Sequence, residues 1–462
     1  MAEPGRVIVV GGGLAGLAAA DALVSSGIGV TLLEARRSLG GRAASFEDPR
    51  GGGLVDACQH VAMGCCTAFR DLCRRAGLSS ALRTDRTLWF IGPDGRRSAC
   101  TPVGWLPAPL HLTPLLLGMR HFSLGERTAL ALGMVRLARL RAVDPTATAA
   151  AWLAGIGQPE RVIRLFWQPV LESALGESLD LVGLAAARKV IVDGFLAHSQ
   201  AADLLVPLVP LGELLGHRLA DWLADRDVAI HTERTVTALR FDDRGRARGV
   251  ITAEGVLEAA AVIVAIPWRA AARLLPEIIP AADERLTGSP ITAIHLWFDR
   301  DVIDLPHAVL VGRTSQWVFR PDPADAAAEP GYCQVVISAS RGLRGADRQQ
   351  LVDTVVAELA DVFPAVRGAV LREARVITDP TAVLSVRPGV DAVRPLATTA
   401  VPGLFLAGDW TATGWPSTME GAVRSGRTAA TAACRFLGAP AVGVVPDLPR
   451  SWLTRLLAGT AR

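Results

Sequence analysis

The chain opens with a short apolar run, a glycine-rich turn and an alanine- and leucine-rich stretch, in that order. Residues 6–10 (RVIVV) predict a buried strand, and residues 11–16 (GGGLAG) follow without a gap. An apolar helix is predicted from there to about residue 26. Residues 30–34 (VTLLE) predict a second strand that ends in an acidic side chain. This strand–helix–strand pattern is typical of parallel sheets.

Similar signals return further along the chain. Residues 404–410 (LFLAGDW) predict a buried strand that ends in Gly-Asp, and residues 418–426 (TMEGAVRSG) predict the start of a helix rich in small residues. Between the two ends, residues 228–241 alternate like one strand, and a small antiparallel meander is predicted to continue to residue 258. Residues 261–267 (AVIVAIP) predict another buried strand.

The remaining segments mix helices and strands. Residues 124–140 carry apolar side chains at helical spacing. Residues 293–298 and 332–338 predict strands, and residues 351–362 predict a helix. This order favours a mixed sheet with helices over a cavity.

Composition narrows the class of protein. Half of the 462 residues are apolar, 20% are charged and the formal net charge is +3, which excludes a disordered chain. Nucleic acid is not an expected partner, because phosphate tracking needs a concentrated basic stripe. The N-terminus runs into a strand without a signal peptide, and the seven cysteines lack paired C-x-x-C spacing. We therefore expect a cytoplasmic protein with free thiols and no metal site.

Two segments are candidates for contact with a membrane surface. Residues 98–119 form the longest stretch without a charged side chain, but they contain four prolines. A spanning helix of about 20 apolar residues does not tolerate four prolines, so we expect this segment to lie at a membrane surface or to wrap a hydrophobic cavity. The second segment is the short basic amphipathic stretch 451–457, a candidate to rest on anionic lipid.

The glycine-rich turn carries the first chemical signal. Gly11 permits a tight turn, Gly13 lets the backbone approach a pyrophosphate at the helix N-terminus, and Gly16 lets helix and strand pack closely. Glu34 is placed to bind a ribose hydroxyl pair. Since all these features occur in order at the right spacing, we expect a dinucleotide cofactor here.

Two further motifs make the cofactor more specific. Gly40-Gly41-Arg42 follows Glu34, and Gly408-Asp409 ends the late strand. With them the chain resembles the flavin-dependent amine oxidase and phytoene desaturase superfamily. The resemblance implies FAD and an α/β fold, with a discontinuous Rossmann-type FAD-binding domain and a substrate domain of mixed sheet and helices. The implied boundaries are 1–88, 207–268 and 396–440 for the FAD-binding domain and 89–206 and 269–395 for the substrate domain. Residues 441–462 form a C-terminal tail, which contains the stretch that is a candidate for membrane contact.

The same resemblance implies which residues bind FAD. Asp409 is expected to hold the ribityl or phosphate region, the helix from Thr418 to point its N-terminus at the isoalloxazine carbonyl, and the backbone near Val236 to touch the adenine. The alternative at residues 404–410 is an ordinary strand with a Gly-Asp turn. The expected contacts are Gly11, Gly13, Leu14, Ala15, Gly16, Glu34, Ala35, Arg36, Gly41, Arg42, Val236, Gly408, Asp409, Thr418, Met419, Glu420 and Ala422.

A closer resemblance, over nearly the whole chain, is to the hydroxysqualene dehydroxylase family. It rests on residues 55–67, 166–171, 206–212, 316–319 and 408–421. It implies that the allylic hydroxyl of a C30 isoprenoid alcohol leaves as water and that a hydride from reduced flavin replaces it, giving squalene for hopanoid synthesis. In one departure, the family usually reads Asp-Asn-Gly-Gln-His where this chain has Asp56-Ala57-Cys58-Gln59-His60.

This reaction requires a proton donor and an apolar tunnel that holds the substrate. Departure of hydroxide needs a proton, and His60 is the candidate acid, with Asp56 as its orienting partner; the alternative for His60 is a structural hydrogen bond. Gln59 and several tryptophans are candidates to line the tunnel, because aromatic faces suit an allylic cation. Core packing is the alternative for each tryptophan. The four are Trp167, Trp317, Trp410 and Trp415.

Two other functions stay open. A carotenoid or phytoene-type desaturase would bind the same cofactor and remove a hydride instead. A flavin amine oxidase is less favoured, because the single lysine, Lys189, lies far in sequence from the flavin motifs. No second dinucleotide fingerprint identifies the electron donor. Because the implied substrate dissolves in bilayers, we expect peripheral attachment to the inner face of the cell membrane.

Overall fold

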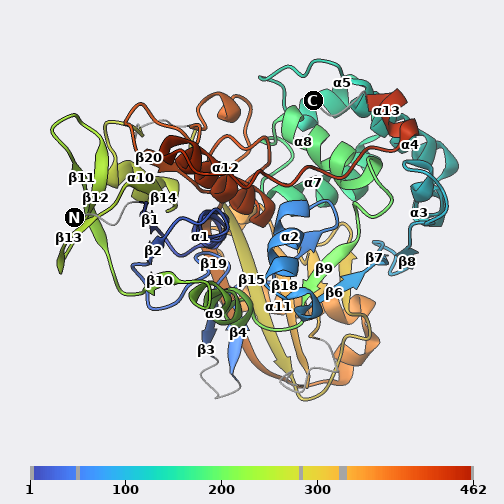
Figure 1. The fold of residues 1–462 in the computed structure, drawn as a ribbon. Coiled ribbons are helices and arrows are strands. Elements are labelled where there is room, and N and C mark those ends of the chain that lie inside the picture. Colours follow the sequence, from blue (N-terminus) through green and yellow to red (C-terminus); the bar gives the residue numbers. More distant parts are fainter. Residues whose placement is uncertain (1–4, 48–52, 280–284, 322–329, 459–462) are drawn as a thin grey trace.

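A five-stranded parallel sheet joins segments from three distant parts of the chain (Figure 1). The structure is a computed structural model that describes residues 5–47, 53–279, 285–321 and 330–458. The strand order is β10-β2-β1-β14-β20, and each neighbouring pair is parallel. The strands are β1 (Val7–Val10), β2 (Val30–Leu33), β10 (Val228–His231), β14 (Ala261–Val264) and β20 (Leu404–Leu406).

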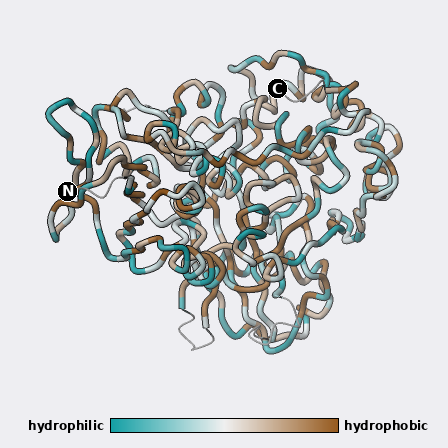
Figure 2. The backbone as a smooth tube through the Cα atoms, in the orientation of Figure 1, coloured by the Kyte–Doolittle hydropathy of each residue, from teal (hydrophilic) through white to brown (hydrophobic). Residues whose placement is uncertain are grey.

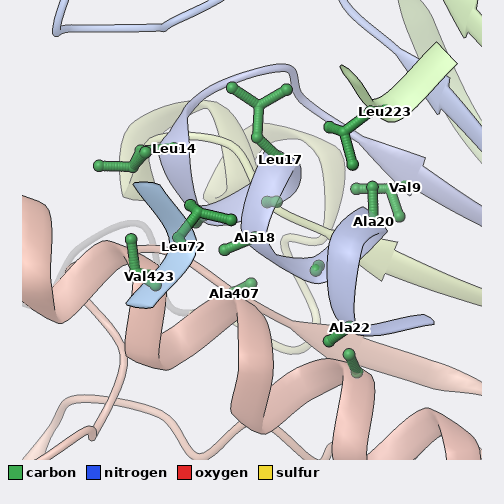
Figure 3. Close-up of a cluster of buried hydrophobic side chains, with 14 of the residues drawn as sticks. Val9, Leu14, Leu17, Ala18, Ala20, Ala22, Leu72, Leu223, Ala407 and Val423 are labelled. Atoms are coloured by element: carbon green, nitrogen blue, oxygen red, sulfur yellow. The ribbon is translucent and has the colours of Figure 1, made fainter. Parts of the chain in front are cut away.

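Two long helices from opposite ends of the chain pack together on one face of this sheet. They are α1 (Leu14–Val24) and α12 (Met419–Leu437), and Figure 3 shows Leu14, Ala18 and Val423 in the shared core. A β-carbon on Gly426 would lie 2.1 Å from the carbonyl oxygen of Ala15. The two backbones therefore touch, and only glycine fits at that crossing.

The predicted strand at residues 228–241 is wrong as a single element. Residues 228–231 form β10 and pair in parallel with β2, at the edge of the large sheet. Glu233 then has a φ of 56°, which breaks the extended backbone, and the chain resumes as β11 (Val236–Phe241). Only β11 enters the antiparallel meander with β12 (Ala247–Thr252) and β13 (Gly255–Glu258). Alternation alone fits an edge strand of either sheet, so it did not show the break.

The second large sheet has seven strands in the order β19-β15-β18-β17-β16-β7-β8. It is mixed, as expected, because β16 and β7 are parallel and the other pairs are antiparallel. The strands are β7 (Leu88–Ile91), β8 (Arg97–Cys100), β15 (Gly288–Phe298), β16 (His307–Leu310), β17 (Trp317–Phe319), β18 (Tyr332–Ile337) and β19 (Leu371–Leu384).

Helices cover this sheet and build a separate apolar core against β7 and β16. The predicted helix at residues 124–140 is α4 (Leu124–Arg139), and Ser123 and Glu126 form a capping box at its start. The predicted helix at 351–362 lies within α11 (Arg348–Val362). The other helices are α2 (Thr67–Arg75), α3 (Thr113–Gly118), α5 (Ala149–Gly155), α6 (Glu160–Val162), α7 (Gln168–Leu175), α8 (Leu184–Ile191), α9 (Leu219–Ala224), α10 (Trp268–Leu274) and α13 (Trp452–Ala458).

Two small sheets connect the larger units. One pairs β3 (Ser45–Glu47) with β4 (Leu54–Asp56), and the other has the order β5-β9-β6. The latter strands are β5 (Ala62–Met63), β6 (Leu82–Asp85) and β9 (Leu204–Pro207). Figure 2 shows many hydrophobic segments running through the middle of the molecule, and strongly hydrophilic segments in its outer loops.

The segment at residues 98–119 folds as the end of β8, an irregular stretch and α3. Within the described parts of the chain, no helix is both long and apolar enough to cross a membrane. Residues 459–462 of the predicted tail lie outside the described residues, and its remaining part runs as an irregular segment into α13.

The contact between α1 and α12 makes a testable prediction about stability. Gly426→Ala is expected to lower the free energy of unfolding by about 1–3 kcal/mol, because the added methyl overlaps backbone atoms of α1. Gly125→Ala is the matched control, since Gly125 is also helical and has no atom within 4 Å of the added carbon. The control should be neutral or stabilise the protein by up to about 1 kcal/mol. Urea unfolding of both variants checks this, and equal effects would contradict it.

Candidate active site

The glycine-rich turn after β1 leaves an open space at the N-terminus of α1. A β-carbon on Gly11 would lie 2.6 Å from the carbonyl oxygen of Ala265, and one on Gly16 would lie 1.9 Å from that of Gly11. At Gly13, by contrast, the nearest atom would be 3.8 Å away. No side chain caps α1 and no acidic residue lies in its first turn. No side chain of the described residues therefore competes with a pyrophosphate for the N-terminus of this helix, as the predicted fingerprint requires.

Glu34 lies beneath this turn at the end of β2. Its buried carboxylate accepts hydrogen bonds from the backbone N–H groups of Gly12 (2.7 Å) and Arg36 (2.8 Å). The N–H of Arg234 donates to the carbonyl oxygen of Glu34 at 2.8 Å. The segment that leads into Val236 therefore lies beside Glu34, so the expected ribose and adenine contacts lie at one edge of the sheet.

The loop at residues 40–42 closes the other side of the space. The N–H of Gly40 donates to the carbonyl oxygen of Gly12 at 2.9 Å, which packs the two glycine-rich loops together. Arg42 forms an ion pair with Asp409, and the hydroxyl of Ser417 donates to the second carboxylate oxygen of Asp409. Residues from three distant motifs thus meet where the sequence predicts the phosphate and ribityl groups.

The N-terminus of α12 begins next to Asp409. Thr418 caps the helix, because its hydroxyl accepts a hydrogen bond from the N–H of Gly421 at 3.2 Å. The carboxylate of Glu420 accepts the N–H groups of Ala68 (2.9 Å) and Phe69 (2.8 Å) and so caps α2 instead. Glu420 is one of the expected cofactor contacts, and its side chain is engaged in joining α12 to α2.

A cavity of about 350 Å³ lies next to Arg42 and residues 416–420. It extends between α7, α8 and the seven-stranded sheet, and its walls are mostly apolar. Representative wall residues are Phe90, Val170, Phe195, Val309, Phe319 and Ile377. A cavity with this lining suits a hydrophobic substrate whose reacting end lies next to the predicted flavin position.

The predicted wall residues separate into two groups. Gln59, Trp317 and Trp415 line the cavity. Trp167 and Trp410 do not, because both are fully buried in the core. Their indole N–H groups donate to the Gln158 side chain (3.0 Å) and to the carbonyl oxygen of Ile266 (2.9 Å). For these two tryptophans the alternative of core packing holds.

His60 lines the cavity, but Asp56 does not orient it. The His60 Nδ1 atom lies 2.7 Å from the carbonyl oxygen of Cys58, so Nδ1–H donates to that oxygen. Asp56 instead accepts from the Ser45 hydroxyl (2.6 Å) and the Leu211 N–H (2.7 Å). Burial raises the pKa of Asp56 to about 6, and burial together with the charge of Arg42 lowers the pKa of His60.

A polar network that the sequence did not predict lies beneath the loop at residues 56–60. The Gln334 side chain accepts the backbone N–H of Gln59 and donates to the carbonyl oxygen of Asp56 at 3.3 Å. The Gln334 amide lies 3.2 Å from the Tyr332 hydroxyl, which lies 2.8 Å from His295 Nδ1. These residues sit on β15 and β18, and only the pairing of those strands brings them under the loop.

Lys189 reaches the cavity wall despite its distance in sequence from the flavin motifs. Its Nζ lies 2.9 Å from carboxylate oxygens of both Asp193 and Asp447, and 4.4 Å from the ring centre of Trp415. The Trp415 N–H donates to Asp447 at 3.2 Å. The four-residue spacing of Lys189, on α8, and Asp193, in the helical turn Val192–Leu196 that follows it, was a readable signal. The approach of Asp447 depends on the C-terminal segment.

The three cysteines at the cavity, Cys58, Cys65 and Cys66, are free thiols. Burial raises the pKa of Cys58 to about 12, so it stays protonated. No group of three or more His, Cys, Asp or Glu side chains that could hold a metal occurs in the described portion of the chain.

Gly13 allows a test of the cofactor site that leaves the fold intact. Gly13→Ala is expected to place a methyl group in the space at the N-terminus of α1 and to raise the dissociation constant for FAD at least tenfold. The thermal midpoint of the FAD-free protein should not change, because no atom lies closer than 3.8 Å to the added β-carbon. Flavin titration and thermal unfolding measure the two effects. Unchanged FAD affinity would contradict this placement of the pyrophosphate.

Comparisons with known proteins agree with this geometry. The family model described as flavin containing amine oxidoreductase matches residues 14–434. A hydroxysqualene dehydroxylase from Sinorhizobium fredii is 28% identical, over 92% of this chain and 98% of that protein. A 15-cis-phytoene desaturase from Solanum lycopersicum is 24% identical, over 93% of this chain and 78% of that protein.

Solved structures share the fold. An oxidoreductase from Methanosarcina mazei superimposes with a TM-score of 0.69 at 17% identity, covering 91% of this chain and 98% of that one. Cyclohexylamine oxidase from Brevibacterium oxydans gives 0.68 at 20% identity, covering 94% of this chain and all of that one. The chain therefore belongs to the flavin-containing amine oxidoreductase family, and it is an FAD-dependent oxidoreductase with an α/β amine-oxidase-like fold.

Proposed function

We propose that the protein reductively dehydroxylates hydroxysqualene, a C30 isoprenoid alcohol, to squalene. The observation that carries the proposal is the apolar cavity that begins beside Arg42 and residues 416–420. The similarity to a hydroxysqualene dehydroxylase over 98% of that protein supports it. In the reaction, a hydride and a proton are consumed, the allylic carbon–oxygen bond breaks, a carbon–hydrogen bond forms and water leaves.

The chain's own residues bind, orient and enclose the reactants. FAD, when bound in its reduced form, supplies the hydride. The N-terminus of α1 and Glu34 are placed to hold its phosphates and ribose, and Arg42 and Asp409 to fix the end nearest the cavity. Apolar walls including Phe90 and Phe319 exclude water. They hold the isoprenoid chain so that its reacting carbon lies next to the predicted flavin position.

The leaving hydroxyl needs a proton, and His60 is the proposed donor. Lys189, Asp193 and Glu420 at the cavity already take part in ion pairs. Asp379, an exposed carboxylate at the cavity wall, accepts hydrogen bonds from the N–H and the hydroxyl of Thr381. With Nδ1–H donated to the Cys58 carbonyl, Nε2 is the ring atom that carries the transferable proton. Because the pKa of His60 is lowered, the ring is mostly neutral near pH 7, and its protonated fraction grows as the pH falls.

His60 gives a prediction with a pH signature. His60→Ala is expected to reduce turnover with reduced flavin about 100-fold or more and to leave FAD bound. In the wild type, kcat should rise as the pH falls from 7 toward the lowered pKa, and this rise should vanish in the variant. His217→Ala is the control, because His217 is an exposed residue paired with Glu213. A near-normal rate for His60→Ala would remove His60 from this role.

One alternative is a carotenoid-type desaturase. The similarity to 15-cis-phytoene desaturases over 93% of this chain favours it, and the apolar walls suit a polyene precursor equally well. Such an enzyme would take a hydride from its substrate and would need oxidised FAD. The two reactions therefore differ in the redox state of the enzyme that they use.

The presence of Lys189 at the cavity removes one argument against an amine oxidase. Its distance in sequence does not correspond to a distance in space. Its ammonium group is nevertheless engaged by Asp193 and Asp447, so it serves as a structural cation in this arrangement.

Product analysis distinguishes the dehydroxylase from the desaturase. Anaerobically reduced protein incubated with hydroxysqualene should yield squalene, whereas oxidised protein incubated with phytoene should yield no desaturated product. Gas chromatography of the extracted lipids measures both. The opposite pattern would establish the desaturase and overturn the proposed dehydroxylation.

A further inference from the structure

One end of the molecule exposes large apolar side chains that a water-facing surface rarely keeps together. They lie on the irregular stretch 101–112, on α3, at the start of α4 and on α13. Trp105 is 83% exposed, Leu124 74% and Leu456 76%. Trp105 and Trp452 are the two tryptophans among the strongly exposed hydrophobic residues of the described chain. The docking face defined here comprises Trp105, Leu110, Leu117, Leu124, Trp452 and Leu456.

The segments that carry these residues are joined into one surface. Helices α3 and α13 both pack against α4, and all three lie at the same end of the molecule (Figure 1). The Ser451 hydroxyl donates to the carbonyl oxygen of Ala108, which ties the start of α13 to the stretch that contains Trp105 and Leu110. The exposed apolar groups are therefore held by tertiary contacts from distant parts of the chain.

Helix α13 presents its apolar residues in an unusual direction. Trp452 and Leu456 are four residues apart, so they share one face of the helix, and both are exposed. Thr454, the small polar residue between them, is 1% exposed and donates its hydroxyl to the carbonyl oxygen of Leu196. Helix α13 therefore buries its threonine and turns its tryptophan and leucine outward. Such an outward face suits contact with an apolar partner rather than with water.

Arginine predominates among the charged residues of α4 and of the chain just before and after it, as far as Asp144. Between residues 98 and 143 the chain has five arginines and one acidic residue, Glu126. Glu126 is paired with Arg161 and so is already neutralised. Arg455 lies on α13 between Trp452 and Leu456 and is exposed. Exposed apolar groups with arginines on the same or a contacting helix are a combination that anionic phospholipid headgroups recognise.

The docking face also lies close to the cavity. Val190 and Phe195 line the cavity. Leu196 and Ala197, which follow Phe195, accept hydrogen bonds from the start of α13. The carbonyl oxygen of Leu196 accepts from Thr454, and that of Ala197 accepts from the N–H of Ser451 at 2.9 Å. The helical turn Val192–Leu196 therefore forms part of the cavity wall and separates the surface helix α13 from the cavity.

From these observations we propose that the docking face binds an anionic phospholipid bilayer. Trp105, Leu117, Trp452 and their neighbours enter the headgroup region, and the surrounding arginines pair with lipid phosphates. The attachment rests on the surface alone. Its role in delivering a bilayer-dissolved substrate across the Val192–Leu196 turn rests on the proposed function.

Vesicle flotation of the full-length, FAD-loaded protein tests the attachment. The protein should float with vesicles of phosphatidylcholine and phosphatidylglycerol, and much less with phosphatidylcholine alone or at high salt. The triple variant Trp105→Ser, Leu117→Ser, Trp452→Ser should lower the lipid-bound to free ratio at least tenfold. Point variants are preferable to deleting the tail, because deletion would also remove Asp447 from Lys189.

The matched control is the triple variant Phe241→Ser, Val256→Ser, Leu396→Ser. These residues are also exposed and apolar, but they lie outside the docking face, so flotation should stay at the wild-type level. Equal flotation of both triple variants would overturn the proposal. Wild-type self-association that only the first variant abolishes, without lipid binding, would also overturn it and would assign the face to a second copy of the chain.

The same preparations separate this proposal from the proposed function. Turnover of detergent-dispersed hydroxysqualene should be equal in the wild type and in the first triple variant, because neither the cavity nor the FAD site is altered. Loss of flotation with retained turnover is the result expected of that variant. Wild-type protein that floats but forms no squalene would contradict the function and leave the attachment standing.

Discussion

The close approach of backbone to backbone around the glycine-rich turn is the constraint on which the rest of the structure depends. Gly16 lets α1 pack on β1, and Gly426 lets α12 cross α1 with no side chain between them. These contacts bring the N-terminal and C-terminal motifs together at the carboxyl ends of the parallel strands. Arg42 and Asp409 can form an ion pair only because both helices are held this closely.

A second constraint is the low polarity of the cavity. Its charged residues are held by partners rather than left free: Lys189 by two carboxylates, Glu420 by two amides and Arg424. This arrangement avoids the cost of burying unpaired charge. It also limits the number of groups able to give up a proton, and this gives the imidazole of His60 its importance in the proposed chemistry.

The sequence was most informative where backbone geometry constrains the residue type. Gly11, Gly13, Gly16 and Glu34 could be placed from their spacing, and the family resemblance supplied FAD, which the comparisons confirm. The fold class followed from the same signals, because buried parallel strands appear as continuous apolar runs.

The sequence was least informative where the outcome depends on packing between distant segments. Alternation could not show that Glu233 would divide residues 228–241 between two sheets. The sequence also could not show which tryptophans are in the core. Trp167 and Trp410 find hydrogen-bond partners there, whereas Trp317 and Trp415 line the cavity. The arrival of Asp447 at Lys189 likewise depends on the path of the C-terminal segment.

The central claim is that reduced FAD in this protein gives its hydride to an allylic alcohol held in the apolar cavity. An anaerobic single-turnover experiment tests it most directly, by recording the flavin spectrum while limiting hydroxysqualene is added to the reduced protein. One flavin should be oxidised for each squalene formed, and oxidised flavin and squalene should appear at the same rate. A flavin that stays reduced, or that is oxidised without formation of squalene, would contradict it.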